Sequence, residues 1–271
     1  MTKKYEFTDE TRTLFSGKVL HRIKALVDIE GVVKAGELGG FIEKEKNLLH
    51  NGKAWVYGDA LVYNTARIYD NAAVFGNAYV FGDAQVYDNA QVYGNARVFN
   101  NAEVFGDAHV TDNARVLDAT QVFGDAYVCD GAFVYGDAHV FGCARVGGNA
   151  QVYDYAKVYG YAKVGGNARI YGKASVAGDV YVIAASIGDG AVIHKSSDYL
   201  CIGPLGSRDD TMTCYRTKRT IGICCGCFCG TLAQFVRAVK KMHGDNQFGQ
   251  DYQLAIEFVK SKFNRTKLKT S

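Results

Sequence analysis

The feature that most constrains the fold is a six-residue repeat that runs through the middle of the chain without an insertion. Beginning at Val56 and ending at Val182, every sixth residue is Val or Ile, 22 times in succession. Two residues before the next such position stands Ala in 19 of 21 cases, and two residues after each Val or Ile stands Gly, Asn or Asp in all 21. A strand position and a corner therefore alternate every six residues.

Each position of the unit has a physical role. Val and Ile favour extended backbone and fill a narrow interior, and Ala fits a tight inner corner. Gly, Asn and Asp adopt positive φ at low cost, which is typical of a turn. Such a short strand followed at once by a corner excludes a helix, and it excludes a sandwich, whose strands are longer. The spacing predicts an all-β solenoid over residues 51–194, with coils that stack their strands in parallel.

The repeated units resemble the hexapeptide repeat of left-handed β-helix proteins, in which three hexapeptides make one coil, as in trimeric acyltransferases. Further segments carry a closer resemblance, namely GELGGFIE at 36–43, the YGDA and YGNA units, IGPLGSR at 202–208 and GCF at 226–228. With them nearly the whole chain resembles the YdcK-like hexapeptide-repeat proteins of bacteria and phages. The resemblance implies a left-handed parallel β-helix, and coils of 18 residues would number about seven.

The two ends of the chain differ from the repeats. We expect residues 1–50 to form an N-terminal cap, since a solenoid must cover its first coil. Residues 195–271 predict a small α+β domain with short strands at 200–203, 212–217 and 220–225, followed by a capping box at Thr231 and Gln234. Two helices follow, with inward faces predicted at Leu232, Phe235, Val236 and Val239 in the first, and at Leu254, Ala255, Phe258 and Val259 in the second.

Charge divides along the same boundaries. Residues 51–194 carry nine basic and 14 acidic side chains, whereas residues 195–271 carry 13 basic and six acidic ones. A basic C-terminal domain on an acidic rod indicates docking between the two, an anionic ligand, or both. The acidic rod argues against nucleic acid as a partner.

The chain starts with charged residues and has no run that approaches 18 apolar residues, so we expect a cytoplasmic protein away from membranes. The eight cysteines are then expected to be reduced thiols. Cys224 and Cys227 have the C-x2-C spacing of a zinc site, but a second clear pair is missing. Buried free cysteines are therefore favoured over zinc, and neither a metal nor a cofactor is predicted.

The segment 202–208 is the best candidate for a binding site. Gly203 and Gly206 allow backbone N–H groups to point at one anion, Ser207 adds a hydroxyl, and Arg208 adds a guanidinium. The alternative is a hairpin whose glycines only make turns and whose basic groups are solvated. Further basic side chains of the predicted ligand-binding set follow at Arg216, Lys218 and Arg219.

The residue after each Val or Ile faces outward, and residues 18 apart form three ladders. Two ladders are aromatic almost throughout, whereas the third has Tyr57, Phe75 and Tyr93 and then only Thr111, Cys129, Gly147 and Gly165. The rings could line a subunit interface, stack nucleobases, or stack on each other. The strip of small residues suggests that the C-terminal domain or another subunit packs closely there.

These observations predict a non-catalytic, homo-oligomeric protein that binds or sequesters a small anionic or nucleotide-type ligand. The resemblance to phage proteins makes a host nucleotide signal one form of that ligand. An acetyltransferase-like enzyme is the alternative, although no loop interrupts the repeats, and His109 and His139 are 30 residues apart and so lie on different faces. A purely structural assembly module is the second alternative.

Overall fold

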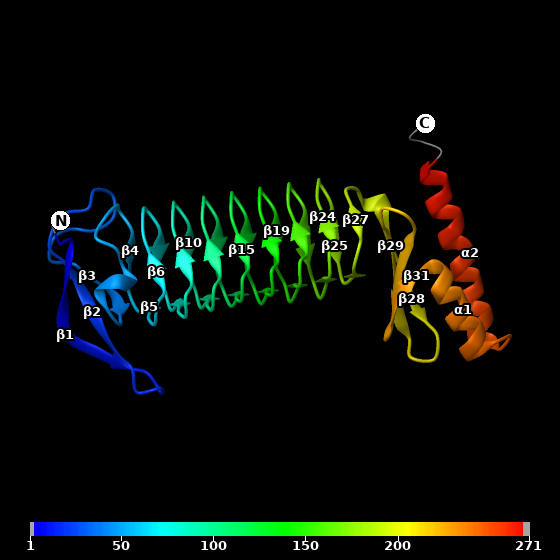
Figure 1. The fold of residues 1–271 in the computed structure, drawn as a ribbon, viewed down its shortest axis with the longest axis horizontal. Coiled ribbons are helices and arrows are strands. Elements are labelled where there is room, and N and C mark those ends of the chain that lie inside the picture. Colours follow the sequence, from blue (N-terminus) through cyan, green and yellow to red (C-terminus); the bar gives the residue numbers. More distant parts are fainter. Residues whose placement is uncertain (1–2, 268–271) are drawn as a thin grey trace.

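A computed structural model describes residues 3–267 as a long β-solenoid with a different cap at each end (Figure 1). The 24 short strands from β4 to β27, three in each coil, make about eight parallel turns. This is one turn more than the seven expected, because the strands continue past Val182 after a one-residue break in the spacing. Among the described residues, no helix is long and apolar enough to cross a membrane.

Three sheets form the sides of the solenoid, and each strand of the repeats pairs with the strand 18 residues later, or 17 residues later for β23 with β26 and β24 with β27. The first sheet contains β1 (Tyr5–Thr13), β2 (Val19–Ala25), β3 (Leu38–Ile42), β5 (Leu61–Val62), β8 (Tyr79–Val80), β11 (Arg97–Val98), β14 (Arg115–Val116), β17 (Phe133–Val134), β20 (Gln151–Val152), β23 (Arg169–Ile170) and β26 (Ser186–Ile187). The second contains β4 (Trp55–Val56), β7 (Ala73–Val74), β10 (Gln91–Val92), β13 (His109–Val110), β16 (Tyr127–Val128), β19 (Arg145–Val146), β22 (Lys163–Gly165) and β25 (Tyr181–Ile183). The third contains β6 (Arg67–Ile68), β9 (Gln85–Val86), β12 (Glu103–Val104), β15 (Gln121–Val122), β18 (His139–Val140), β21 (Lys157–Val158), β24 (Ser175–Val176) and β27 (Val192–Ile193).

The interior and the turns confirm the roles assigned to the repeat. The Val, Ile and Ala positions of the repeat are buried, including the two exceptions to Ala, Thr120 and Val180. All 21 turn positions that carry Gly, Asn or Asp have positive φ, between 54° and 74°. Gly, Asn or Asp at the turn position of the repeat therefore predicts a left-handed backbone conformation there.

The turn aspartates have a second role that links successive coils. Five of them accept a hydrogen bond from the backbone N–H of the turn residue in the next coil, at 2.7 to 3.2 Å. The pairs are Asp88 with Gly106, Asp112 with Asp130, Asp118 with Gly136, Asp130 with Gly148, and Asp154 with Gly172. The choice of Asp at these turns thus supplies an acceptor as well as a permitted φ.

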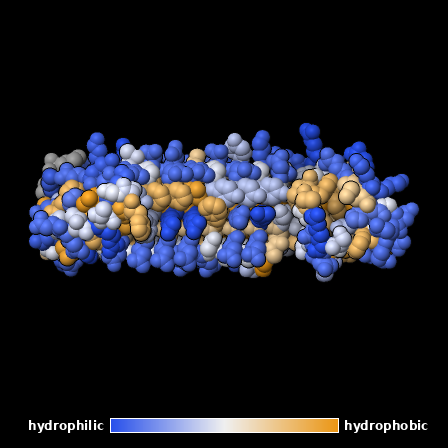
Figure 2. All heavy atoms as spheres, turned by 90° about the horizontal axis from the view of Figure 1, so that it is seen from below, coloured by the Kyte–Doolittle hydropathy of each residue, from blue (hydrophilic) through white to orange (hydrophobic). Residues whose placement is uncertain are grey.

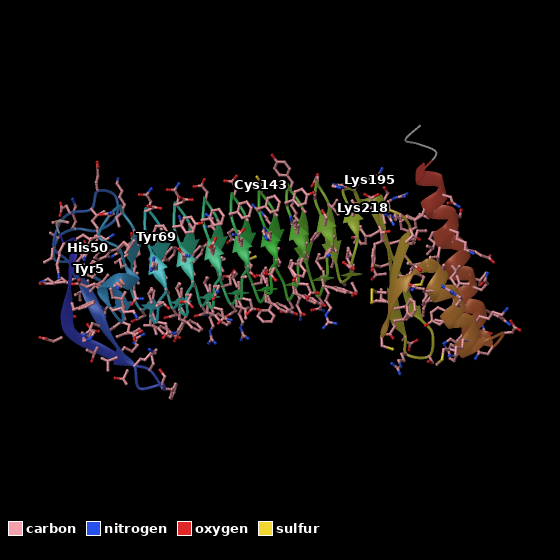
Figure 3. The ribbon with its side chains drawn as sticks, viewed as in Figure 1. Tyr5, His50, Tyr69, Cys143, Lys195 and Lys218 are labelled. Atoms are coloured by element: carbon pink, nitrogen blue, oxygen red, sulfur yellow. A yellow bond between two sulfur atoms is a disulfide. The ribbon has the colours of Figure 1, made fainter. Side chains whose placement is uncertain are left out.

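The N-terminal cap supplies hydrogen-bond donors to carbonyl groups of the first coils. Lys4 Nζ donates to the carbonyl oxygen of Ala54 at 2.8 Å, and Asn47 Nδ2 donates to that of Ala66 at 2.8 Å. Tyr5 stacks on His50 with ring centroids 4.6 Å apart, at the end of the rod that Figure 3 labels. Strands β1 to β3 extend the first sheet beyond the repeats, so the cap and the solenoid share one sheet.

The C-terminal domain is an antiparallel sheet covered by two helices. Its elements are β28 (Tyr199–Leu205), β29 (Asp210–Arg216), β30 (Ile221–Cys225), β31 (Phe228–Thr231), α1 (Leu232–His243) and α2 (Gln247–Lys267). Thr231 and Gln234 form the predicted capping box. The predicted inner face of α2 is wrong in part, because Leu254 and Phe258 are exposed while Ile256 and Phe263 are buried.

This domain closes the far end of the rod by supplying acceptors and a salt bridge. Thr213 Oγ1 accepts from the backbone N–H of Ser186 at 3.2 Å. The buried Asp198 carboxylate accepts from the N–H groups of His194 and Lys195 at 3.0 and 3.1 Å, and it pairs with Arg216 Nε at 3.2 Å. The domain therefore lies at the end of the solenoid and does not fold back along its side (Figure 1).

Candidate functional site

The predicted binding residues do not form one cluster. Ser207 and Arg208 lie in the turn between β28 and β29, whereas Lys218 and Arg219 lie in the turn between β29 and β30, at the other end of β29. A β-bridge between Ala191 and Thr217 places the second turn, where Figure 3 labels Lys218, on the side of the domain that faces the rod. The seven-residue strand β29 separates the two turns by roughly 20 Å. A single small ligand cannot contact both groups.

The Arg216 side chain already has partners within the protein. Besides its ion pair with Asp198, its Nη2 donates to the carbonyl oxygen of Phe263 at 3.1 Å, and its guanidinium lies 5.3 Å from the Phe263 ring centroid. The side chain thus ties α2 to the end of the solenoid. Its position in the predicted binding set reflects charge alone.

The structure does bring Gly206, Ser207 and Arg208 to the edge of a pocket. This pocket of about 240 Å³ is lined by Ser207 and Arg208 and by Asp210, Cys225, Gly226, Cys227, Phe228, Phe235, Ala238, Val239, Met242, His243 and Tyr252. Gly206 has a φ of 71°, and a Cβ there would collide with the Tyr252 hydroxyl. Glycine is therefore required for the turn to approach α2 this closely. Gly203 lies earlier, within β28.

The pocket combines an apolar floor with polar groups at its edge. Phe228, Phe235 and Tyr252 supply rings, and the Tyr252 ring centroid lies 5.5 Å from that of His243. Among residues 3–267, the exposed Arg208 side chain has no ion-pair or hydrogen-bond partner. The arrangement suits a ligand with one ring system and one anionic group.

Cys225, the buried one of the two cysteines that line the pocket, is poorly suited to nucleophilic chemistry. Burial raises the pKa of the Cys225 thiol, and the nearby Asp210 carboxylate raises it further. Burial and the contact with Cys225 raise the pKa of Tyr252 to about 12. Both groups are protonated at neutral pH, and a protonated thiol is a weak nucleophile.

Sequence reasoning missed the residues of this pocket that come from the helices. His243 is the last residue of α1, and Tyr252 lies in α2. Their contribution depends on how the helices cross the sheet, which no local spacing encodes. A basic residue at the end of a predicted helix was the one available signal for His243.

Two further cysteines correct the prediction of eight reduced thiols. Cys224 and Cys229 are paired across β30 and β31 and form a disulfide. The Tyr171 hydroxyl lies 3.0 Å from each of the two sulfurs. Cys224 is thus not available as a zinc ligand with Cys227, which lies in the turn between the two strands.

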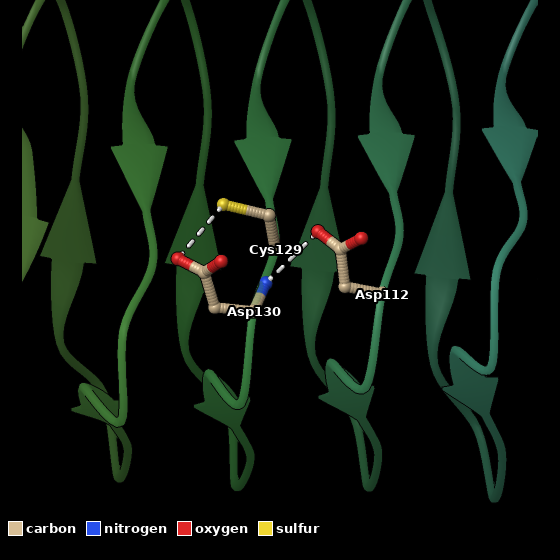
Figure 4. Close-up of side chains that lie close together, drawn as sticks. All are labelled: Asp112, Cys129 and Asp130. Carbon is tan, nitrogen blue, oxygen red and sulfur yellow. Dashed lines mark hydrogen bonds between the residues drawn. The ribbon is translucent and has the colours of Figure 1, made fainter.

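The strip of small outward residues is filled by the rod's own side chains. A Cβ at Gly147 would lie 2.9 Å from Asp130 Oδ2 and 3.0 Å from Cys129 Sγ, and one at Gly165 would lie 3.4 Å from the Tyr181 ring. Asp112, Cys129 and Asp130 also place three potential metal ligands within 4.8 Å of one another (Figure 4). Both carboxylates already accept turn N–H groups, so the group serves the coils.

The aromatic ladders stack on themselves. Neighbouring rings such as Phe81 and Phe99 are parallel within 10°, with centroids 4.7 to 5.3 Å apart, and Tyr57 and Phe75 instead meet edge to face at 6.3 Å. Ring faces are covered by the rings of adjacent coils and only ring edges face outward. This geometry leaves little room for a nucleobase to stack.

The histidines considered for catalysis are far apart in the coils. His109 lies on the second sheet between Tyr93 and Tyr127, and His139 lies on the third sheet. Burial lowers the pKa of His139. The two imidazoles do not share a site.

Comparison with known proteins places the repeat in a described group. Residues 90–106 match a family model described as YdcK Beta solenoid repeat. A search of curated proteins finds no match. The matched segment covers about one coil of a solenoid whose other coils have the same strand, turn and corner positions. Residues 90–106 therefore carry a repeat of the YdcK β-solenoid type, within a solenoid of about eight turns.

Proposed function

We propose that this protein is a non-catalytic binding protein that holds a small anionic, nucleotide-type ligand in the pocket of its C-terminal domain. The observation that carries the proposal is the exposed Arg208 guanidinium, without a protein partner among residues 3–267, at the edge of a pocket lined by Phe228 and Tyr252. The rings offer contact to a base, Arg208 offers a fork for a phosphate, and Asp210 offers an acceptor for an amino group.

The proposed role is to sequester the ligand, and not to convert it into a product. The protonated Cys225 thiol offers no activated nucleophile in the pocket. A volume of about 240 Å³ is below the usual range for ligand pockets, which favours a ligand with a single base. We further propose that the protein acts in the cytoplasm as a homo-oligomer.

Titration calorimetry against linear and cyclic nucleotides and coenzyme A tests the proposal. Arg208→Ala should abolish binding of the best nucleotide with an unchanged circular dichroism spectrum. Arg219→Ala, at the other end of β29, is the matched control and should bind as the parent does. If none of these compounds binds, the alternative of a structural assembly module is supported. Turnover of acetyl coenzyme A would support the alternative of an acetyltransferase-like enzyme.

A further inference from the structure

A second candidate site lies at the opposite end of the molecule, on the outer side of the first sheet. The turn between β1 and β2 overhangs this sheet and encloses a cleft of about 630 Å³. The cleft is lined by Arg12, Thr13, Leu14, Phe15, Ser16, Lys18, Leu61, Tyr63, Asn64, Tyr79 and Phe81. Phe15, at the tip of the turn, is fully exposed.

The cleft continues into an arginine pair along the rod. Strand pairing places Arg97 next to Tyr79, and Arg115 next to Arg97, on successive coils. The Arg97 guanidinium lies 5.5 Å from the Tyr79 ring centroid. Like charges directly opposite each other on a sheet are unfavourable. Within residues 3–267 neither arginine has an acidic partner, so the repulsion between them is not offset.

The charge on this side of the rod differs from the net charge of the solenoid. Every acidic residue of the repeats except Glu103 lies at a turn, and Glu103 is in the third sheet. Within the repeats, the outward positions of the first sheet carry Arg97, Arg115 and Arg169 and no carboxylate, and the acidic residues of this sheet lie in β1, in the N-terminal cap. Seen from below, the rod has a continuous row of apolar and weakly polar side chains with strongly hydrophilic ones beside it (Figure 2).

We propose that this cleft and arginine pair bind an extended acidic peptide segment of a partner protein. An apolar side chain of the segment occupies the cleft against Tyr63 and Phe15, and the carboxylates that follow pair with Arg97 and Arg115. Residues two apart on an extended chain point to the same side about 7 Å apart, which is wider than the rungs of about 4.8 Å, and the long arginine side chains span the difference. Nucleic acid is a poorer fit, because the stacked rings present only their edges.

Fluorescence anisotropy with a labelled peptide tests this proposal. The probe is a hexapeptide with one Phe followed by alternating Glu and Ser, compared with the same peptide carrying Gln for Glu and with oligothymidylate. The double variant Arg97→Gln, Arg115→Gln should weaken binding of the acidic peptide about tenfold or more, as expected for lost charged hydrogen bonds. Phe15→Ser should weaken both peptides without affecting the fold, since Phe15 is exposed.

The matched control is Arg145→Gln with Lys163→Gln, a cationic pair on adjacent strands of the second sheet. This variant should bind the acidic peptide as the parent does. The proposal is overturned if the parent does not bind that peptide, if both double variants lose affinity equally, or if oligothymidylate binds more tightly. The pocket at Arg208 is not touched by these changes, so the two proposals fail independently.

Discussion

Substitution of Gly106 separates the two roles of the turn position, backbone conformation and hydrogen bonding to the next coil. Gly106 has a φ of 68°, and a Cβ there would lie 2.9 Å from the backbone nitrogen of Gly124. A residue other than Gly costs about 1–2 kcal/mol in this conformation. Gly106→Ala should therefore lower the free energy of unfolding by about that amount, and Gly106→Val by more because of its β-branch.

Gly106→Asp should behave differently, because Asp118 has the same conformation and accepts from Gly136 N at 3.1 Å. The backbone N–H of Gly124 has no protein partner among the described residues, and the new carboxylate would supply one. A hydrogen bond to a charged group contributes about 1.5–3 kcal/mol, which offsets the conformational cost. The Asp variant should be as stable as the parent, within about 1 kcal/mol.

Urea denaturation of the parent and the Ala, Val, Asp and Asn variants measures these differences under one set of conditions. The expected order of stability places Asp and Asn above Ala, and Ala above Val. Equal destabilisation by Ala and Asp would refute the role of the carboxylate. A Val variant as stable as the Asp variant would refute the conformational argument itself.

Four other predictions concern the core, the two caps and the strip of small outward residues that contains Gly147. Val110→Asp should abolish soluble folding, because an unpaired buried carboxylate costs several kcal/mol; normal melting would contradict the inward assignment. The pKa of Lys4 is lowered to about 8 from 10.5 by burial, so the unfolded state binds more protons between those values. The stability of the parent relative to Lys4→Met should therefore rise with pH from about 8 toward 9.5, which chemical denaturation of both proteins across that range would detect. Asp198→Ala should cost about 3 kcal/mol and expose the chain near residue 195 to limited proteolysis, because it leaves the guanidinium of Arg216 without its carboxylate; an unchanged cleavage pattern would exclude this role of the ion pair. Gly147→Ala should lower the melting temperature without changing the mass in light scattering, since its Cβ meets side chains of the same chain; a change in mass would reveal a subunit contact instead.

The solenoid was predictable because the same constraint is repeated many times. Every turn position carries Gly, Asn or Asp, so each one supports the assignment of the others. Asp112 is assigned to a turn because it falls on the six-residue period, although an Asp taken alone does not indicate a turn. The C-terminal domain lacks that redundancy. In α2, one apolar stripe contains Leu254 and Phe258 and another contains Ile256 and Phe263, and only packing against the sheet decides between them.

The candidate site was predictable only where it is local in sequence. Ser207 and Arg208 were assigned correctly to one turn with Gly206, because adjacent residues stay adjacent in space. Arg216 was grouped with them although the strand between carries it to the other end of the sheet. His243 belongs to the pocket through a helix crossing that no spacing in the sequence describes.

The register of the repeats, which is unbroken from Val56 to Val182, sets the distance between the two caps. Every coil offers the next one the same pattern of strand and turn groups, so both caps would meet the same partners if 18 residues were removed or added. Each such change would shift the N-terminal cleft relative to the C-terminal pocket by one rung, about 4.8 Å. The number of coils therefore determines the distance between the two ends. That distance can change in steps of one coil without a change in the sequence of either cap.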